Sequence, residues 1–157
     1  AWKIALESKT TPTALILSRQ NLPLQNSSFE DVKKGAYVVE KANCHEDVIL
    51  LATGSEVDLA VKTKKLLLEK GVDAKVVSMP STYLFDLQSE EYKKEILSLP
   101  REKVISVEML STFGWHKYSA HPYGIDTFGT SAPAKDAIRA YHFLPEDLCE
   151  FVLKVVK

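Results

Sequence analysis

The stretch VILLATGSEVDLAVKTKKLLLEKG (residues 48–71) decides the fold. Its first five residues form an uninterrupted apolar run, which is typical of a strand buried on both faces of a parallel sheet. Thr53 and Gly54 then turn the chain into an amphipathic helix that ends at Gly71. A buried strand followed directly by a helix is the repeating unit of an α/β domain.

The helix that follows Gly54 has a recognisable capping pattern at its N-terminus and an apolar stripe along one face. Ser55 and Asp58 have the spacing of a capping box, which predicts that the serine hydroxyl caps the first turn. The apolar residues that form the predicted buried stripe of this helix, interrupted at Lys64, are Val57, Ala60, Val61, Leu67 and Leu68.

The same alternation continues along the chain. Further strands are predicted at 36–40, 75–79, 104–108 and 124–128. Helices are predicted at 89–97, 115–120, 134–141 and 145–156. Strands that alternate with helices indicate a three-layer α/β/α domain with an open, mostly parallel sheet of about five strands.

The N-terminal part has a different organisation. Residues 1–7 have an amphipathic helical pattern, and the apolar run that ends the segment 13–17 predicts a buried strand followed by Ser18 and Arg19. A polar linker with one helical turn at 29–34 comes next. We therefore expect a domain boundary near residue 25.

The composition excludes several classes of protein. The 157 residues are 45% hydrophobic and 26% charged, with a net charge of −1, which favours a soluble globular protein without an electrostatic attraction to nucleic acid or to membranes. No apolar run has the length of a membrane span. The first residue is not Met, so we expect a piece of a longer or processed chain. Cys44 and Cys149 lack a CxxC spacing, which does not favour zinc and fits a reducing, cytoplasmic compartment.

Ligands of open α/β sheets favour the carboxyl ends of the strands, where four turns are expected to gather, at 52–56, 78–82, 107–110 and 127–134. Two of these turns open helices with small hydroxyl-bearing residues, so they form either an anion pocket or simply tight turns and caps. Glu108, at a strand end, is the best single carboxylate. His116 and His121 are five residues apart and miss the spacing of a shared helical face, and His142 closes a helix.

Four stretches resemble transketolases in order and spacing: LSRQNLP (17–23), ATGSEVDLAV (52–61), VVSMPS (76–81) and FGTSAPA (128–134). Related thiamine enzymes share the TGS-type turn but lack the SRQN motif. The resemblance implies that residues 1–24 are the tail of a pyrimidine-binding domain and that 25–157 are the carboxyl-terminal domain. It further implies a homodimeric parent enzyme of the pentose phosphate pathway that transfers two-carbon ketol units between sugar phosphates.

The resemblance also implies what this chain lacks and what it supplies. The parent would use thiamine diphosphate and a divalent cation (Mg or Ca). The family's cofactor and metal motifs have no counterpart in this sequence, so no catalytic, cofactor-binding or metal-binding residue is assigned. We therefore expect the isolated chain to be inactive. By motif position Arg19 would bind the terminal substrate phosphate, for which a guanidinium is well suited.

Three alternatives remain open from the residues. Arg19 could instead pair with a surface carboxylate at its strand end. The chain could be the homologous end of a 2-oxoacid dehydrogenase β subunit. It could also be a regulatory module that binds an anion or nucleotide at the TGSE turn.

Overall fold

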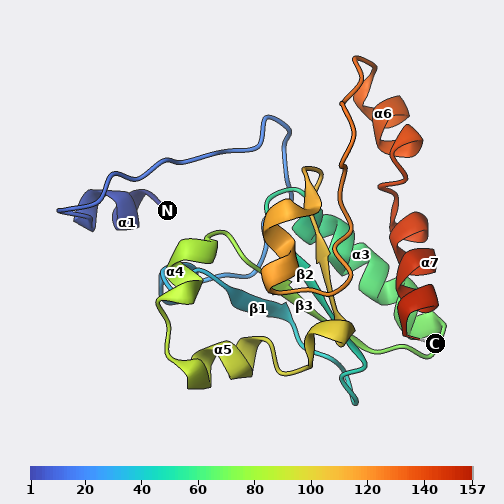
Figure 1. The fold of residues 1–157 in the computed structure, drawn as a ribbon, viewed down its shortest axis with the longest axis horizontal. Helices are drawn as coiled ribbons and strands as arrows, with labels where there is room; N and C mark the ends of the chain where they lie inside the picture. The colour runs from blue at the N-terminus through green and yellow to red at the C-terminus, as the bar shows by residue number, and fades with distance from the viewer. Residues whose placement is uncertain (157) are drawn as a thin grey trace.

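Strand β2 (Val48–Ala52) is the centre of the computed structural model, which describes residues 1–156 (Figure 1). It pairs in parallel with β3 (Ala74–Ser78) on one side and with β4 (Val104–Val107) on the other. β1 (Tyr37–Glu40) joins β3 antiparallel at the edge, so the order is β1-β3-β2-β4. The predicted mostly parallel α/β fold is confirmed, with a sheet of four strands where about five were expected.

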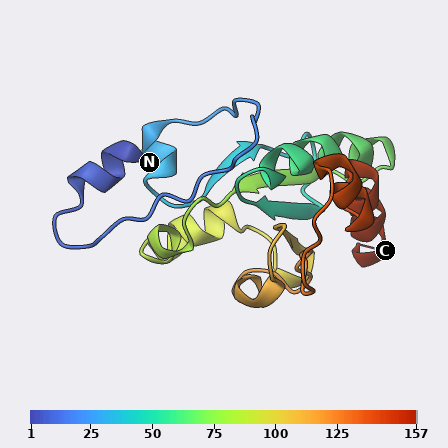
Figure 2. The same ribbon diagram turned by 90° about the horizontal axis from the view of Figure 1, so that it is seen from above.

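The two faces of the sheet pack against different helices because successive side chains of a strand point in opposite directions. Val48, Leu50 and Ala52 belong to the hydrophobic cluster under α3 (Glu56–Glu69) and α7 (Pro145–Val155). Ile49 and Leu51 belong to the opposite cluster, with Phe85 of α4 (Thr82–Asp86) and Ile96 of α5 (Glu90–Ile96). Figure 2 shows α3, in green, on one side of the sheet and α5 on the other.

The remaining helices lie in the connections, and most of the predicted ones are confirmed. They are α1 (Trp2–Glu7), α2 (Phe29–Val32), α6 (Ala134–Ala140) and two 3-10 helices, η1 (Arg101–Lys103) and η2 (Thr112–Lys117). The sequence reading missed α4, a single short helix whose N-terminus is capped by the Ser81 hydroxyl, which accepts a hydrogen bond from the Leu84 N–H at 3.2 Å.

The predicted buried stripe of α3 is right in its first half and partly wrong in its second. Leu67 is fully buried, whereas Leu68 is 45% exposed. Lys64, expected to interrupt the stripe, is itself buried because its ammonium group donates to the Lys41 carbonyl oxygen and lies 3.7 Å from the Glu40 carboxylate. The predicted capping box is wrong: the Ser55 hydroxyl donates to Glu56 Oε1 at 2.6 Å and makes no cap.

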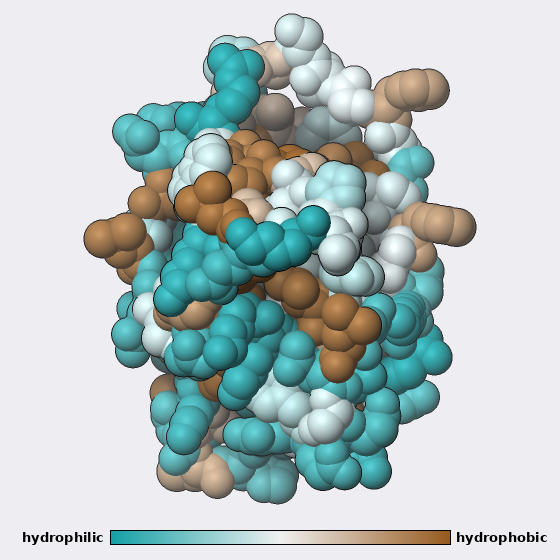
Figure 3. All heavy atoms as spheres, turned by 90° about the vertical axis from the view of Figure 1, so that its left-hand side faces the viewer, coloured by the Kyte–Doolittle hydropathy of each residue, from teal (hydrophilic) through white to brown (hydrophobic). Residues whose placement is uncertain are grey.

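Two predicted strands are absent from the described residues. The segment 13–17 is extended but not buried, with Ile16 96% and Leu17 71% exposed, because no strand among residues 1–156 lies beside it. At 124–128 the chain makes only an isolated bridge just before it, between Tyr123 and Val107, and then leaves the sheet. Trp2 and Leu6 of α1 are 70% and 75% exposed. Brown apolar residues lie among the teal ones on the side of the molecule from which α1 projects (Figure 3).

Candidate functional site

The carboxyl ends of the three parallel strands form one edge, as the sequence predicts. The Met79 N–H, directly after β3, donates to the Ala52 carbonyl oxygen at the end of β2 over 2.8 Å. The turns after β2, β3 and β4 therefore gather at this edge. The fourth turn, 127–134, does not join them: every residue in it is exposed, and it leads outward to α6 (Figure 1).

The SRQNLP segment lies over this edge. Ser18 Oγ is 3.6 Å from the position that a Cβ atom on Gly54 would occupy, so the segment touches the turn between β2 and α3. Beyond this contact, Leu22, Pro23 and Gln25 close one side of a cavity of about 190 Å³. The domain side of that cavity is lined by Tyr37, Gly54, Val57, Asp58 and Ser78. The strand-end crevice is thus partly filled by the chain's own N-terminal segment.

Arg19 is exposed beside this contact. Within residues 1–156 its guanidinium group makes no ion pair or hydrogen bond that would hold it to the domain. The alternative in which Arg19 pairs with a carboxylate at its own strand end therefore gains no support from the geometry. The arrangement leaves a planar cationic group on a segment anchored on both sides, at Ser18 and at Leu22.

Two carboxyl groups meet at the same edge. Glu56 is the first residue of α3 and is 2% exposed, and Glu108 follows β4 directly and is half-buried. Burial raises the pKa of Glu108 to about 7, and the charge of Glu56 and a hydrogen bond with its side chain contribute to the rise. The pair therefore holds a proton close to neutral pH.

The pair changes how the TGSE turn is interpreted. The free N–H groups at the start of a helix attract anions, but here Glu56 brings a carboxylate to that position and Glu108 faces it. A second anion would be repelled by this charge. The alternative of an anion or nucleotide pocket at this turn is therefore disfavoured.

Sequence reasoning singled out Glu108 but missed Glu56 as its partner. The available signal was that each glutamate comes within four residues of the end of a predicted strand. Their meeting depends on β2 and β4 being neighbours in the sheet, and the order of strands was not predicted.

The other candidate residues do not form a constellation. His116 and His142 are exposed, and His121 is half-buried, with its N–H donating to Ser119 Oγ at 3.0 Å. Cys44 is an exposed free thiol and Cys149 a buried one in α7. Among residues 1–156 no three histidine, cysteine or carboxylate side chains come together as metal ligands. In the same part of the chain, every helix is too short or too polar to span a bilayer.

Comparison with known proteins gives a consistent result. Residues 35–144 match the family model of the transketolase-like TK C-terminal domain. A probable transketolase from Streptococcus pneumoniae is 47% identical over 156 residues, covering 97% of this chain and 24% of the relative. The transketolase from Bacillus subtilis is 46% identical over 151 residues, covering 91% of this chain and 23% of the relative.

Solved structures agree with the sequence relatives. A transketolase from Pichia stipitis in complex with sedoheptulose-7-phosphate superimposes with a TM-score of 0.91 at 45% identity, covering 99% of this chain and 23% of that one. The chain therefore spans about a quarter of the length of the relatives that it matches.

Proposed function

This chain belongs to the transketolase family, and we propose that it forms the carboxyl-terminal region of a thiamine-diphosphate-dependent transketolase, in which Arg19 binds the terminal phosphate of sugar-phosphate substrates. The observation that carries the proposal is the placement of Arg19. Its guanidinium group is exposed and without a partner in the described chain, on a segment seated against the carboxyl edge of the sheet.

The physical fit to a phosphate is good. A guanidinium group offers two parallel N–H donors to phosphate oxygens and keeps its charge at any working pH. The transketolase from Pichia stipitis has been solved in complex with a sugar phosphate, sedoheptulose-7-phosphate, which supports this class of substrate. Arg19 would hold and orient the phosphate end, and the two-carbon transfer would take place elsewhere on the enzyme.

The N-terminal segment supports a boundary between two domains. Residues 13–17 have the apolar pattern of a buried strand, yet they are exposed and lie beside no other strand of the described chain. We propose that this strand completes the sheet of a preceding pyrimidine-binding domain, to which 1–24 belong, and that 25–157 are the carboxyl-terminal domain. Unpaired strand backbone of this kind is satisfied by a neighbouring sheet edge.

The residues of this chain do not fit the divalent cation and thiamine diphosphate that the family uses. No three potential metal ligands come together within residues 1–156, so the divalent cation and the thiamine diphosphate that accompanies it would bind elsewhere in the full-length enzyme. We propose that this chain alone is inactive and that the full-length enzyme is a homodimer in the cytoplasm.

The function is tested on the full-length enzyme by steady-state kinetics of an Arg19→Ala variant. A phosphorylated ketose and hydroxypyruvate, which carries no phosphate, are compared as donors. A loss confined to the phosphorylated donor supports the assignment of Arg19, and equal losses with the two donors refute it. Calorimetric titration of the isolated chain with thiamine diphosphate and Mg²⁺ tests the second part, because saturable binding would contradict it.

A further inference from the structure

The cavity beneath the SRQNLP segment originates in the sheet itself. Ala52 and Ser78 are partners in the register of β2 and β3, and they follow the partners Leu50 and Val76 on the face that α3 covers. Two small side chains thus end the strands where two larger ones precede them, and they leave a hollow at the carboxyl edge. The N-terminal segment covers this hollow and encloses about 190 Å³.

The Ser78 hydroxyl is a buried polar group that lines this cavity without a protein partner. Ser78 is only 6% exposed. None of the side-chain hydrogen bonds within residues 1–156 involves its hydroxyl. Leaving a buried hydroxyl without a hydrogen bond is unfavourable, so a molecule in the cavity that bonds to Ser78 would recover this free energy.

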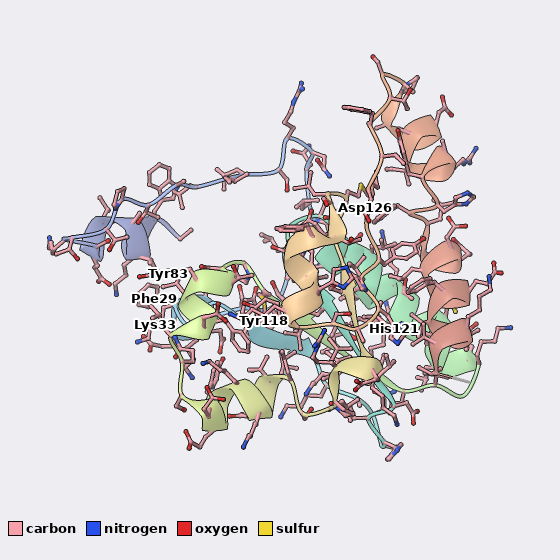
Figure 4. All side chains as sticks on the ribbon, viewed as in Figure 1. Phe29, Lys33, Tyr83, Tyr118, His121 and Asp126 are labelled. Carbon is pink, nitrogen blue, oxygen red and sulfur yellow. The ribbon has the colours of Figure 1, made fainter. Side chains whose placement is uncertain are left out.

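The central polar groups of a larger cavity, on the opposite face of the sheet, are paired with one another. This cavity measures about 400 Å³ and lies beside Tyr118, at the end of η2 (Figure 4). The Tyr118 hydroxyl and the Lys117 ammonium group both donate to the Asp86 carboxylate, at 2.9 and 2.6 Å. The unsatisfied hydroxyl of Ser78 therefore favours the smaller cavity as a binding site.

The volume of the smaller cavity limits the size of its occupant. A cavity of about 150 Å³ in a protein core accommodates benzene, so the present one has room for roughly six to eight non-hydrogen atoms. A nucleotide or a pentose phosphate is much larger than this. The occupant must therefore be a small molecule.

The walls of the cavity are apolar on one side and polar on the other. Leu22, Pro23 and Val57 present C–H surface, whereas Ser78 and Gln25 carry a hydroxyl and an amide group. Small-molecule sites typically combine apolar walls with a few polar groups that fix orientation. A short carbon chain that carries hydroxyl groups matches both kinds of wall.

The charges around the cavity favour a neutral occupant. Asp58 lines the cavity, but its carboxylate lies 2.6 Å from Lys62 Nζ, so a cation would find this charge already compensated. The carboxyl groups of Glu56 and Glu108 lie at the same edge of the sheet and would repel an anion.

We propose that the cavity between the SRQNLP segment and the carboxyl ends of β2 and β3 binds a small neutral polyol, of the size of glycerol or erythritol, with the Ser78 hydroxyl as its hydrogen-bonding anchor. The site is distinct from the phosphate contact proposed for Arg19. Its test uses this chain and no measurement of activity, so it stands or fails independently of the Arg19 kinetics.

Nuclear magnetic resonance of this chain, titrated with glycerol, tests the proposal. The backbone amide signals of Gly54, Val57 and Ser78 should shift and saturate in the millimolar range. Glycerol 3-phosphate, which adds charge and size, should bind at least about tenfold more weakly. Shifts that grow linearly with glycerol indicate a solvent effect and overturn the proposal. Tighter binding of glycerol 3-phosphate or of benzene overturns it as well, because the site would then select an anion or an apolar molecule.

Substitutions at Ser78 connect the signal to the cavity. Ser78→Val replaces the hydroxyl by a methyl group and adds a second one, which should abolish saturable binding. Ser78→Ala keeps the space and loses only the hydroxyl, so the affinity should fall by about fivefold. Ser106→Ala is the matched control, because Ser106 is another buried strand serine without a partner, but its hydroxyl is sealed from solvent. Unchanged binding in both Ser78 variants would refute the assignment.

The segment that covers the cavity also carries Arg19, which gives a second measurement. A polyol bound between this segment and the sheet should hold the segment in place and slow the cleavage by trypsin after Arg19. Cleavage after the exposed Lys9 is the internal control and should not change. Slowing at both positions, or slowing that persists in Ser78→Val, would show a general effect of glycerol and contradict the proposal.

Discussion

Glu56 and Glu108 bring two carboxyl groups together at the carboxyl ends of β2 and β4, neighbouring strands that are far apart in the sequence. Burial, together with the charge and the hydrogen bond of Glu56, raises the pKa of Glu108 from 4.5 to about 7. Below this pKa the pair retains a proton, which one oxygen donates to the other carboxylate. Above it, two negative charges face each other beside the first turn of α3.

Because of this pair, we expect the chain to lose stability as the pH rises through about 7. Glu108 binds its proton more tightly in the folded state, so its contribution is complete below pH 4.5 and is lost as the pH approaches the folded pKa. A shift of this size corresponds to about 3 kcal/mol, which partial exposure reduces to about 1–2 kcal/mol. Urea unfolding at several pH values measures the slope.

Glu108→Gln should remove this slope because an amide can donate a hydrogen bond to Glu56 at every pH. The variant is therefore expected to be at least as stable as the wild type above neutral pH. Glu102→Gln, an exposed position in η1, is the matched control and should keep the slope. An unchanged slope in Glu108→Gln would show that the two carboxyl groups do not share a proton.

Alanine substitutions at Gly35 and Gly71, two glycines of similar backbone conformation, should differ strongly in their effect on the free energy of unfolding. Both Gly35 and Gly71 have positive φ, +85° and +79°. A Cβ atom on Gly35 would lie 2.3 Å from the Phe85 nitrogen and 2.5 Å from the Ser81 carbonyl oxygen, whereas Gly71 has no atom within 4 Å. Gly35→Ala should therefore lower the free energy of unfolding by more than about 3 kcal/mol, and Gly71→Ala by about 1 kcal/mol. Equal losses in urea unfolding would refute the close approach of α4 to Gly35.

The Asp73 carboxylate stabilises the loop before β2. Its Oδ2 atom accepts hydrogen bonds from the N–H groups of Asn43 at 2.6 Å and Cys44 at 2.7 Å. Burial opposes ionisation, but these bonds outweigh it and lower the pKa of Asp73. Asp73→Asn should cost about 2 kcal/mol at neutral pH, because a neutral amide oxygen forms weaker hydrogen bonds with these N–H groups than the charged carboxylate does.

The pH dependence of this loss has the opposite sign to that of Glu108. Because the pKa of Asp73 is lowered in the folded state, its contribution to stability is complete above pH 3.8 and is lost as the pH falls through the folded-state pKa. The difference in unfolding free energy between the wild type and Asp73→Asn should therefore shrink in acid. Asp58→Asn removes the ion pair between the half-buried Asp58 and the exposed Lys62 one turn later on α3, and should cost no more than about 0.5 kcal/mol. A comparable cost for the two variants would show that the loop does not depend on Asp73.

The sequence predicts the elements of this fold well wherever the local pattern and the burial agree. The strand at 48–52 is found with its predicted limits because a run buried on both faces needs no knowledge of its neighbours. The segments 13–17 and 124–128 were also predicted as strands, but the first lies beside no strand of the described residues and the second leaves the sheet after the bridge between Tyr123 and Val107. The same limit applies to the site, since Glu56 meets Glu108 only through the strand order. The role of Arg19 stays a prediction.

Arg19 provides the most direct test of function in the full-length enzyme. A phosphate contact is remote from the reacting carbon and is similar in the ground and transition states, so its loss raises KM and largely spares kcat. Removing one member of a charged pair at a water-accessible site costs about 2 kcal/mol, or roughly 30-fold in affinity. Arg19→Ala should therefore raise KM for phosphorylated donors by about this factor and leave hydroxypyruvate nearly unaffected. Arg19→Lys should recover part of the loss, because an ammonium group keeps the charge but not the two parallel donors. A fall in kcat with both donors would instead mean that Arg19 supports the packing of its segment over Gly54.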